Sequence, residues 1–89
     1  MNAIITVVGA DKVGIIAQVS AFLAERNINI EDISQTVLSG NFVMMMMVEL
    51  SQSTTSLEKV KEDLADFGSS LHVSINLMHQ AVFKAMHRL

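Results

Sequence analysis

The chain has 89 residues, a length that fits one domain built around a single hydrophobic core. A net charge of −3, with six Lys and Arg residues in total, argues against a surface that follows nucleic-acid phosphates. The lack of Cys excludes a disulfide framework, and no apolar run approaches the roughly 18 residues of a membrane span. We therefore expect one small cytoplasmic domain, with no nucleic-acid or membrane partner, that gains stability by forming oligomers.

The first part of the chain predicts a strand followed by a helix. Residues 3–8 are rich in β-branched residues and end at Gly9, which is typical of a strand that enters a loop. From residue 13 to residue 25 the apolar side chains recur at helical spacing. Asp11 is predicted to cap this helix, because its carboxylate can accept hydrogen bonds from unpaired backbone N–H groups.

The next segment predicts a bent β-hairpin. Apolar residues alternate within residues 28–38 but change phase near residues 31–32, which predicts a strand with a bulge at that point. Residues 39–41 (Ser-Gly-Asn) form a tight turn signal, and residues 42–50 continue as an apolar strand. We therefore expect the two strands to pair.

The second half of the chain predicts a helix, a strand and a short terminal helix. Residues 55–58 (Thr-Ser-Leu-Glu) match a capping box, after which apolar residues recur at helical spacing until Gly68 ends the pattern. Residues 71–77 alternate between apolar and polar, as a strand with one buried face does. Residues 79–89 are expected to form the terminal helix, and the mixed charges over residues 58–63 predict a solvated helix face.

The predicted element order is βαββαβ plus a terminal helix. The first and third strands are apolar on both faces and belong in the centre of a sheet, whereas the mixed second and fourth strands belong at its edges. We predict an α+β ferredoxin-like sandwich with an antiparallel sheet in the order 4-1-3-2 and both main helices on one face. Its core spans about residues 3–78 and its C-terminal helix about residues 79–89. The other face of the third strand then needs cover from the terminal helix or another subunit.

Sulfur and imidazole groups are present without the pattern of a metal site. Strand alternation places at most two sulfurs of the Met run at residues 44–47 on each face, with no Cys beside them, which favours core packing. His72, His79 and His87 have no carboxylate at ligand spacing. No nucleophile turn or His and carboxylate partnership is recognisable, so we predict no metal, no cofactor and no enzymatic activity.

The connection between the first strand and the first helix is a candidate ligand site. It consists of Gly9, Ala10, Asp11, Lys12, Val13, Gly14 and Ile15. One interpretation is a tight connection with a helix cap, in which the glycines relieve crowding. The other is a cradle in which exposed N–H groups and the positive end of the helix dipole hold a carboxylate, with or without help from Lys12. The loop residues alone favour neither interpretation.

A set of spaced residues extends from this loop into the second strand. The set comprises Gly9, Asp11, Gly14, Ile15, Val19, Leu23-Ala24-Glu25 and Asn27-Ile28-Asn29-Ile30. It resembles the ACT domain, a small-molecule-binding regulatory module of amino-acid metabolism, and the element order agrees over about residues 3–78. The short chain and residues 32–37 are similar to small bacterial stand-alone ACT-domain proteins, akin to the regulatory halves of the glycine cleavage repressor.

The resemblance implies a non-catalytic regulatory module that binds an amino acid as a homodimer or higher oligomer. The implied ligand-binding residues are Gly9, Asp11, Lys12, Val13, Gly14 and Ile15 from one chain and Asn29 from its neighbour. Val13 stands where many relatives have Pro, which implies a less rigid loop. The sequence carries no enzyme or DNA-binding segment, so the regulated enzyme or regulator protein is expected to be a separate partner. A ligand-free dimerisation or protein-interaction module is the alternative.

Overall fold

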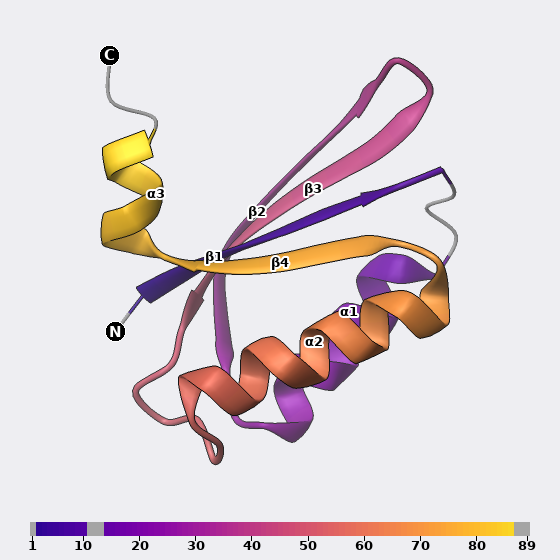
Figure 1. Cartoon of the computed structure of the whole chain (residues 1–89). Helices are drawn as coiled ribbons and strands as arrows, with labels where there is room; N and C mark the ends of the chain where they lie inside the picture. Colours follow the sequence, from indigo (N-terminus) through magenta and orange to yellow (C-terminus); the bar gives the residue numbers. More distant parts are fainter. Residues whose placement is uncertain (1, 11–13, 87–89) are drawn as a thin grey trace.

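The computed structural model describes residues 2–10 and 14–86, and its elements follow the predicted order (Figure 1). They are β1 (Asn2–Gly9), α1 (Ile15–Glu25), β2 (Asn29–Leu38), β3 (Asn41–Glu49), α2 (Leu57–Leu71), β4 (Ser74–His79) and α3 (Gln80–Met86). The strands form one sheet in the order β2-β3-β1-β4, and every neighbouring pair is antiparallel. This confirms the predicted sheet order, with the two strands that are apolar on both faces at the centre.

The core lies between the sheet and the helices α1 and α2, which share one face of the sheet, while α3 stands apart at the end of β4 (Figure 1). Alternate residues of a strand point to the same face, so Met44 and Met46 of β3 both face the helices. Both side chains are fully buried, together with Ile5 of β1 and Leu64 of α2. Burial of apolar surface at about 25 cal/mol per Å² is what holds this layer together.

The β2–β3 hairpin has the predicted bulge and turn. The pairing register shifts between Ile30 and Asp32, which leaves Glu31 as the extra residue of the bulge. Leu38 pairs with Asn41, so the turn has two residues, and both have positive φ angles, 52° at Ser39 and 80° at Gly40. Such a turn matches the twist of the strands that it joins.

Helix α2 starts one residue later than the capping box predicted. Ser56 is the N-cap, and its hydroxyl oxygen accepts a hydrogen bond from the Lys59 backbone N–H at 3.2 Å. The predicted box would have used Thr55 and Glu58, and that prediction was wrong by one residue. The mechanism is the same, because the cap satisfies an N–H group that has no partner within the helix.

The prediction that Gly68 ends α2 was also wrong, because the helix continues to Leu71. Gly68 is buried where β4 passes close to the helix: a Cβ there would lie 2.9 Å from the carbonyl oxygen of Val73 and 3.0 Å from Cγ1 of Ile75. The glycine is therefore required for helix–strand packing rather than for termination. His72 takes the left-handed conformation, φ 59°, that ends the helix, and the Val73 N–H donates to the Gly68 carbonyl at 2.9 Å.

The terminal helix begins at Gln80, one residue later than predicted. β4 begins at Ser74 rather than at residue 71, because Leu71 still belongs to α2. α3 covers residues 80–86, and residues 87–89 of the predicted helix lie outside the described residues. It contacts β1 and β4 of its own chain, while its Val82 stays 50% exposed. Within residues 2–10 and 14–86, no helix has the length and apolar character needed to cross a membrane.

Candidate functional site

The predicted loop site is bounded by two glycines. Gly9 is the last residue of β1, and its pairing with β3 places it at the end of the sheet where the β2–β3 hairpin turns. Gly14 is the N-cap residue of α1. The predicted binding residues Asp11, Lys12 and Val13 lie outside the described residues. The structure thus places the two borders of the predicted cradle at one end of the sheet.

Gly14 has a backbone conformation that favours glycine. Its φ of 75° lies in the left-handed region, and a Cβ there would be 3.2 Å from Nε2 of Gln18. Its carbonyl oxygen accepts a hydrogen bond from the Gln18 backbone N–H at 2.9 Å, which begins the helix. Gly14 supplies no side-chain cap, and the predicted cap Asp11 is outside the described residues. The first-turn N–H groups therefore form a helix N-terminus of the kind that favours an anion.

Gly9 and Ile15, two further described residues of the loop site, present no side chain to a ligand. Gly9 is buried and carries no side chain. Ile15 points its side chain into the core, with 4% of the residue exposed. Any specificity for a ligand side chain has to come from other residues.

Asn29, the remaining predicted binding residue, lies at the opposite end of the sheet. It is the first residue of β2 and pairs with Glu49, which in turn pairs with Asn2 at the start of β1. Because β1 runs from Asn2 to Gly9, at about 3.3 Å per residue its two ends are roughly 23 Å apart. Asn29 and the loop therefore do not meet within one chain.

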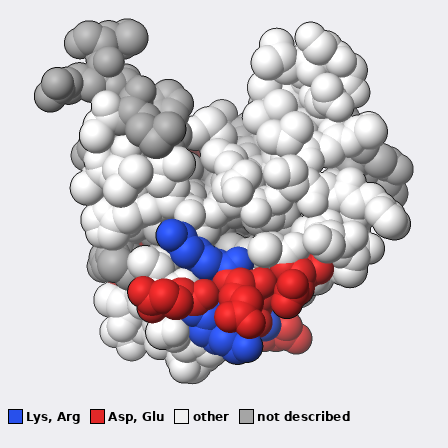
Figure 2. All heavy atoms as spheres, in the orientation of Figure 1, with Lys and Arg blue, Asp and Glu red and all other residues white. Residues whose placement is uncertain are grey.

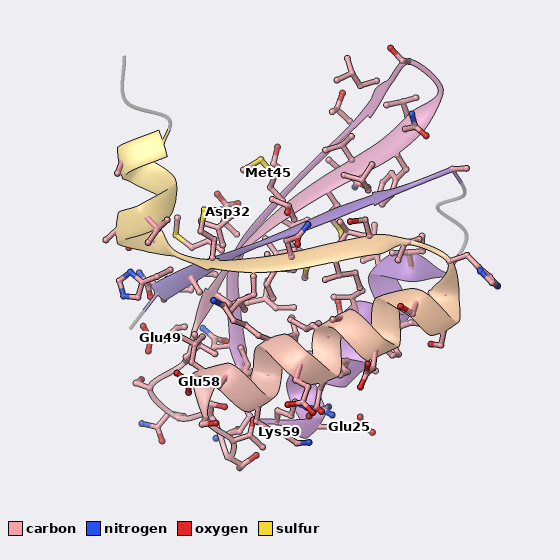
Figure 3. The ribbon with its side chains drawn as sticks, in the orientation of Figure 1. Glu25, Asp32, Met45, Glu49, Glu58 and Lys59 are labelled. Atoms are coloured by element: carbon pink, nitrogen blue, oxygen red, sulfur yellow. The ribbon has the colours of Figure 1, made fainter. Side chains whose placement is uncertain are left out.

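Asn29 and Glu49 share the face of the sheet that points away from the helices. Val48 faces the core, so its neighbour Glu49 points the other way, and Figure 3 shows it near the start of β1. The Ser51 backbone N–H donates to Oε1 of Glu49 at 2.6 Å. Hydrogen bonds from Ser51 are the main reason why the pKa of Glu49 is lowered to about 2. Sequence reasoning did not select Glu49, although an acid at the end of an apolar strand was the available signal.

β2 is an edge strand with exposed apolar side chains. The sheet order leaves one side of this ten-residue strand without a partner strand in the chain. Ile33 is 39%, Val37 60% and Leu38 65% exposed. Unpaired backbone groups and apolar side chains on one edge attract a further strand. The edge is therefore suited to pairing with another chain.

The methionines divide between the two faces as predicted. Met44 and Met46 are fully buried against the helices, which confirms their packing role, whereas Met45 and Met47 are half-buried on the other face. Met45 and Asp32 lie together on that face in Figure 3. It carries a cavity of about 190 Å³ lined by Ile4, Asp32, Ser34, Met45, Met46 and Met47. None of these lining residues belongs to α3.

Both described histidines lie at the ends of secondary-structure elements. His72 is the left-handed residue that ends α2. Nδ1 of His79 accepts a hydrogen bond from the Ala81 N–H at 3.0 Å, where β4 passes into α3. His87 lies outside the described residues. In the part of the chain that the structure describes, no group of three His, Cys, Asp or Glu side chains is arranged to hold a metal ion.

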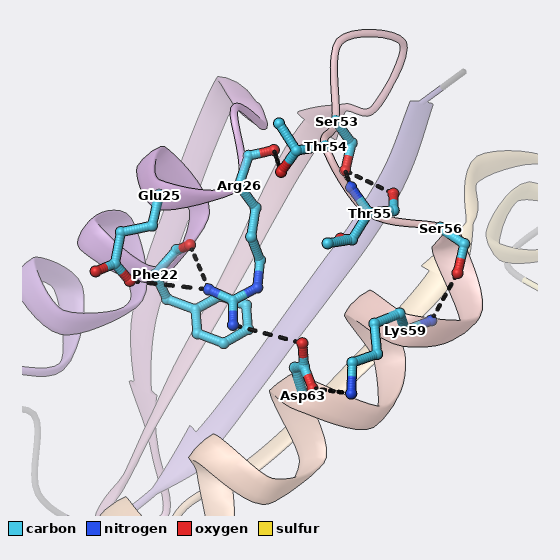
Figure 4. A network of polar contacts seen from close by, with 9 residues as sticks. All are labelled: Phe22, Glu25, Arg26, Ser53, Thr54, Thr55, Ser56, Lys59 and Asp63. Atoms are coloured by element: carbon cyan, nitrogen blue, oxygen red, sulfur yellow. Dashed lines mark hydrogen bonds and ion pairs between the residues drawn. The ribbon is translucent and has the colours of Figure 1, made fainter.

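A larger cavity, of about 610 Å³, lies between α1 and α2 and was not predicted. Its lining residues are Gln18, Ala21, Phe22, Glu25, Arg26, Asp63, Asp66 and Phe67. The guanidinium of Arg26 stacks on the Phe22 ring and reaches across to Asp63 (Figure 4). Charged side chains gather over these helices, while the rest of the same face of the molecule is largely uncharged (Figure 2). We call this cavity the interhelical groove.

Comparison with known proteins agrees with the fold. The family model described as ACT domain matches residues 2–78. A UPF0237 protein of Listeria monocytogenes serotype 4b is 51% identical over 89 residues, which cover all of both chains. An ACT domain protein structure from Streptococcus pneumoniae is 47% identical, with a TM-score of 0.84 over 98% of each chain.

A more distant likeness concerns the fold alone. A structure assigned to a glycine cleavage system transcriptional repressor is 21% identical, with a TM-score of 0.75 over 89% of this chain and 47% of the other. These findings confirm the resemblance that the spaced residues from Gly9 to Ile30 indicated. The chain belongs to the ACT domain family, a family of ligand-binding regulatory domains.

Proposed function

We propose that this chain is a non-catalytic regulatory module that binds an amino acid between the two copies of a homodimer. The observation that carries the proposal is the separation of the implied binding residues, since Gly9, where the loop begins, and Asn29 lie at opposite ends of one sheet. A second copy has to supply the missing half of the site. Membership of a ligand-binding regulatory family supports the same role.

The exposed edge of β2 offers a way to join the two halves. If β2 pairs antiparallel with β2 of a second copy about a two-fold axis, the start of one strand meets the end of the other. The ends of β2 and β1 lie at the same end of the sheet, because both strands are antiparallel to β3. This pairing therefore brings Asn29 of one copy to the end of the sheet that carries the loop of the other, and it covers part of the exposed apolar edge.

The chemistry of the two halves suits an amino acid. Its carboxylate requires donors, and the first-turn N–H groups of α1 supply them at a helix end, where the dipole contributes about 0.3 to 1 kcal/mol when exposed. Its ammonium group requires acceptors, and the amide oxygen of Asn29 is one. The carboxylate of Glu49, which is ionised at neutral pH and whose pKa is lowered further to about 2, adds negative potential beside Asn29.

A thermal-shift screen of the protein amino acids, with the oligomeric state measured by light scattering, tests this proposal. A ligand that binds only the folded state stabilises it by about 2.7 kcal/mol at a hundredfold excess over Kd. For a domain of this size, that corresponds to a rise in Tm of about 10 °C or more. We expect at least one amino acid to give such a shift and the protein to be a dimer. A monomer at tens of micromolar that responds to no amino acid would contradict the proposal.

Two variants separate the site from the rest of the surface. Asn29→Ala is expected to reduce the thermal shift while leaving the dimer intact, because it removes one acceptor and no apolar contact. Asn76→Ala on β4 is the matched control, since Asn76 is also an exposed asparagine on a strand. A shift that is unchanged in both variants would place the ligand elsewhere.

The exposed apolar side chains of β2 favour a second candidate, a dimerisation module without a ligand. Such a module is expected to dimerise in the same way, to give no thermal shift with any amino acid, and to co-purify with the enzyme or regulator that it joins. In either role we place the chain in the cytoplasm, where its regulated partner would be a separate protein. The amino-acid screen distinguishes the two roles directly.

A further inference from the structure

The interhelical groove has an aromatic floor that joins the two helices. The ring of Phe22 on α1 stacks on the ring of Phe67 on α2, with 5.0 Å between centroids and 29° between planes. On Phe22, the guanidinium carbon of Arg26 lies 3.6 Å from the ring centroid. Ala21 adds a small exposed residue to the same lining. The floor therefore offers apolar contact area between two fixed helices.

Among the described residues that line the groove, Arg26 is the one cation, and it is already engaged with groups of its own chain. Nη1 of Arg26 donates to the carbonyl oxygen of Phe22 at 3.0 Å, and Nη2 donates to Oδ2 of Asp63 at 3.4 Å (Figure 4). Nη1 also lies 3.8 Å from Oε1 of Glu25. Lys59, outside the lining, approaches the other oxygen of Asp63 at 3.3 Å. The positive charge of Arg26 is thus neutralised locally and is poorly placed to bind an anion.

The rim of the groove carries excess negative charge. Its lining has three carboxylates, Glu25, Asp63 and Asp66, against the single guanidinium of Arg26. The side chain of Glu25 is 76% exposed and makes one long ion pair. Asp66 is exposed, and among the described residues no cation forms an ion pair with it. Two carboxylates therefore face solvent beside an apolar floor.

We propose that the interhelical groove is a docking surface for a basic amphipathic segment of a partner protein. Lys or Arg side chains of that segment would reach Glu25 and Asp66, and an apolar residue would cover the floor at Phe67. Charge complementarity selects a basic partner, because an acidic one would meet the exposed carboxylates of Glu25 and Asp66. A helix is the fitting form, because the 11 and 15 residues of α1 and α2 give two ridges of roughly 16 and 22 Å.

The interhelical groove is separate from the proposed amino-acid site. The groove lies between the outer surfaces of the helices, whereas the proposed ligand site uses the loop before α1 and the start of β2. A regulatory module requires a surface through which it binds the protein that it regulates, and the interhelical groove supplies such a surface. The two proposals can therefore fail separately.

Binding of a synthetic peptide tests the docking surface. The probe is an amidated helical peptide of about 15 residues composed of Ala, Leu and Arg, and its partner probe has Glu in place of Arg. We expect the Arg peptide to bind the full chain, to shift the amide resonances of Gln18, Ala21 and Phe67, and to bind more weakly as salt is raised. The Glu peptide is expected not to bind.

Charge-reversed variants identify the groups involved. The double variant Glu25→Lys with Asp66→Lys is expected to weaken binding of the Arg peptide by about tenfold, since each exposed ion pair becomes a repulsion. The matched control is Glu31→Lys with Glu62→Lys, which makes the same change in net charge at exposed positions outside the groove. Circular dichroism confirms that both variants fold. Equal affinity of the two double variants, or resonance shifts confined to the sheet, would overturn the proposal.

Discussion

The left-handed conformation of Gly14 leads to a prediction about its substitution by alanine. A residue with a Cβ pays about 1 to 2 kcal/mol at positive φ, and φ is 75° here. Alanine recovers about 0.4 to 1 kcal/mol by restricting the unfolded chain. The new Cβ would lie 3.2 Å from Nε2 of Gln18, the far end of a flexible side chain that can move away. We therefore expect Gly14→Ala to lower the free energy of unfolding by about 1 kcal/mol.

Chemical denaturation measures this change, and Gly14→Asn is the matched control. Asparagine adds the same Cβ but tolerates the left-handed region better, so it is expected to cost less than alanine. A loss of about 1 kcal/mol lowers the Tm of a domain of this size by roughly 4 to 8 °C. If alanine raised the stability, or if asparagine cost more than alanine, the backbone argument for Gly14 would be refuted.

Three further predictions concern packing and pH. Met46→Ala is expected to lower the free energy of unfolding by about 2 to 5 kcal/mol because it leaves a cavity, whereas half-buried Met45→Ala should cost about 1 kcal/mol, as measured in urea. Gly68→Ala is expected to destabilise by about 1 kcal/mol despite its higher helix propensity, because its Cβ displaces β4; a higher Tm would contradict this. The folded-state pKa of Glu49 is lowered, so its contribution to stability is present above pH 4.5 and is lost as the pH falls toward 2. Glu49→Gln should therefore flatten the acid limb of the stability profile in that window, and an unchanged limb would show that Glu49 does not cause it.

The sheet was predictable because its signals are local and repeat along each strand. β1 and β3 have apolar residues on both faces, and a strand covered on two sides has to lie inside a sheet. The bulge at Glu31 was predicted from a change of phase in the alternation of apolar and polar residues. The turn at Ser39 and Gly40 was predicted from two residues that favour tight turns. Each signal depends on neighbours within a few residues.

The end of α2 was not predictable because a glycine at position 68 can either end a helix or allow another segment to pack closely against it. A glycine after a helical pattern is usually a terminator, and the sequence does not show that Val73 and Ile75 return to within 3.0 Å of its Cβ position. Termination instead falls to His72, a residue that adopts positive φ less often than glycine. The role of Gly68 therefore depends on tertiary packing against β4, which the local sequence does not reveal.

The candidate site was predictable only in part for the same reason. The loop was selected from its own residues and Asn29 from the resemblance to the ACT domain, but the sequence does not show that roughly 23 Å of sheet separates them. The interhelical groove depends on the contact between Phe22 and Phe67 and on the ion pair of Arg26 with Asp63, which are 37 residues apart. The helical spacing of apolar residues does not indicate that these two rings line a cavity.

A mixed-dimer titration tests most directly whether one ligand site takes residues from two chains. Gly14→Val fills the space beside the loop backbone and Asn29→Ala removes the acceptor, so both homodimers are expected to bind the amino acid found in the screen more weakly than the wild type. When the two variants are mixed and allowed to exchange subunits, each mixed dimer has one site with both substitutions and one site with neither. Calorimetry of the mixture is then expected to show wild-type affinity at about one site per mixed dimer. A mixture that binds no better than its two parents would contradict a site shared between chains.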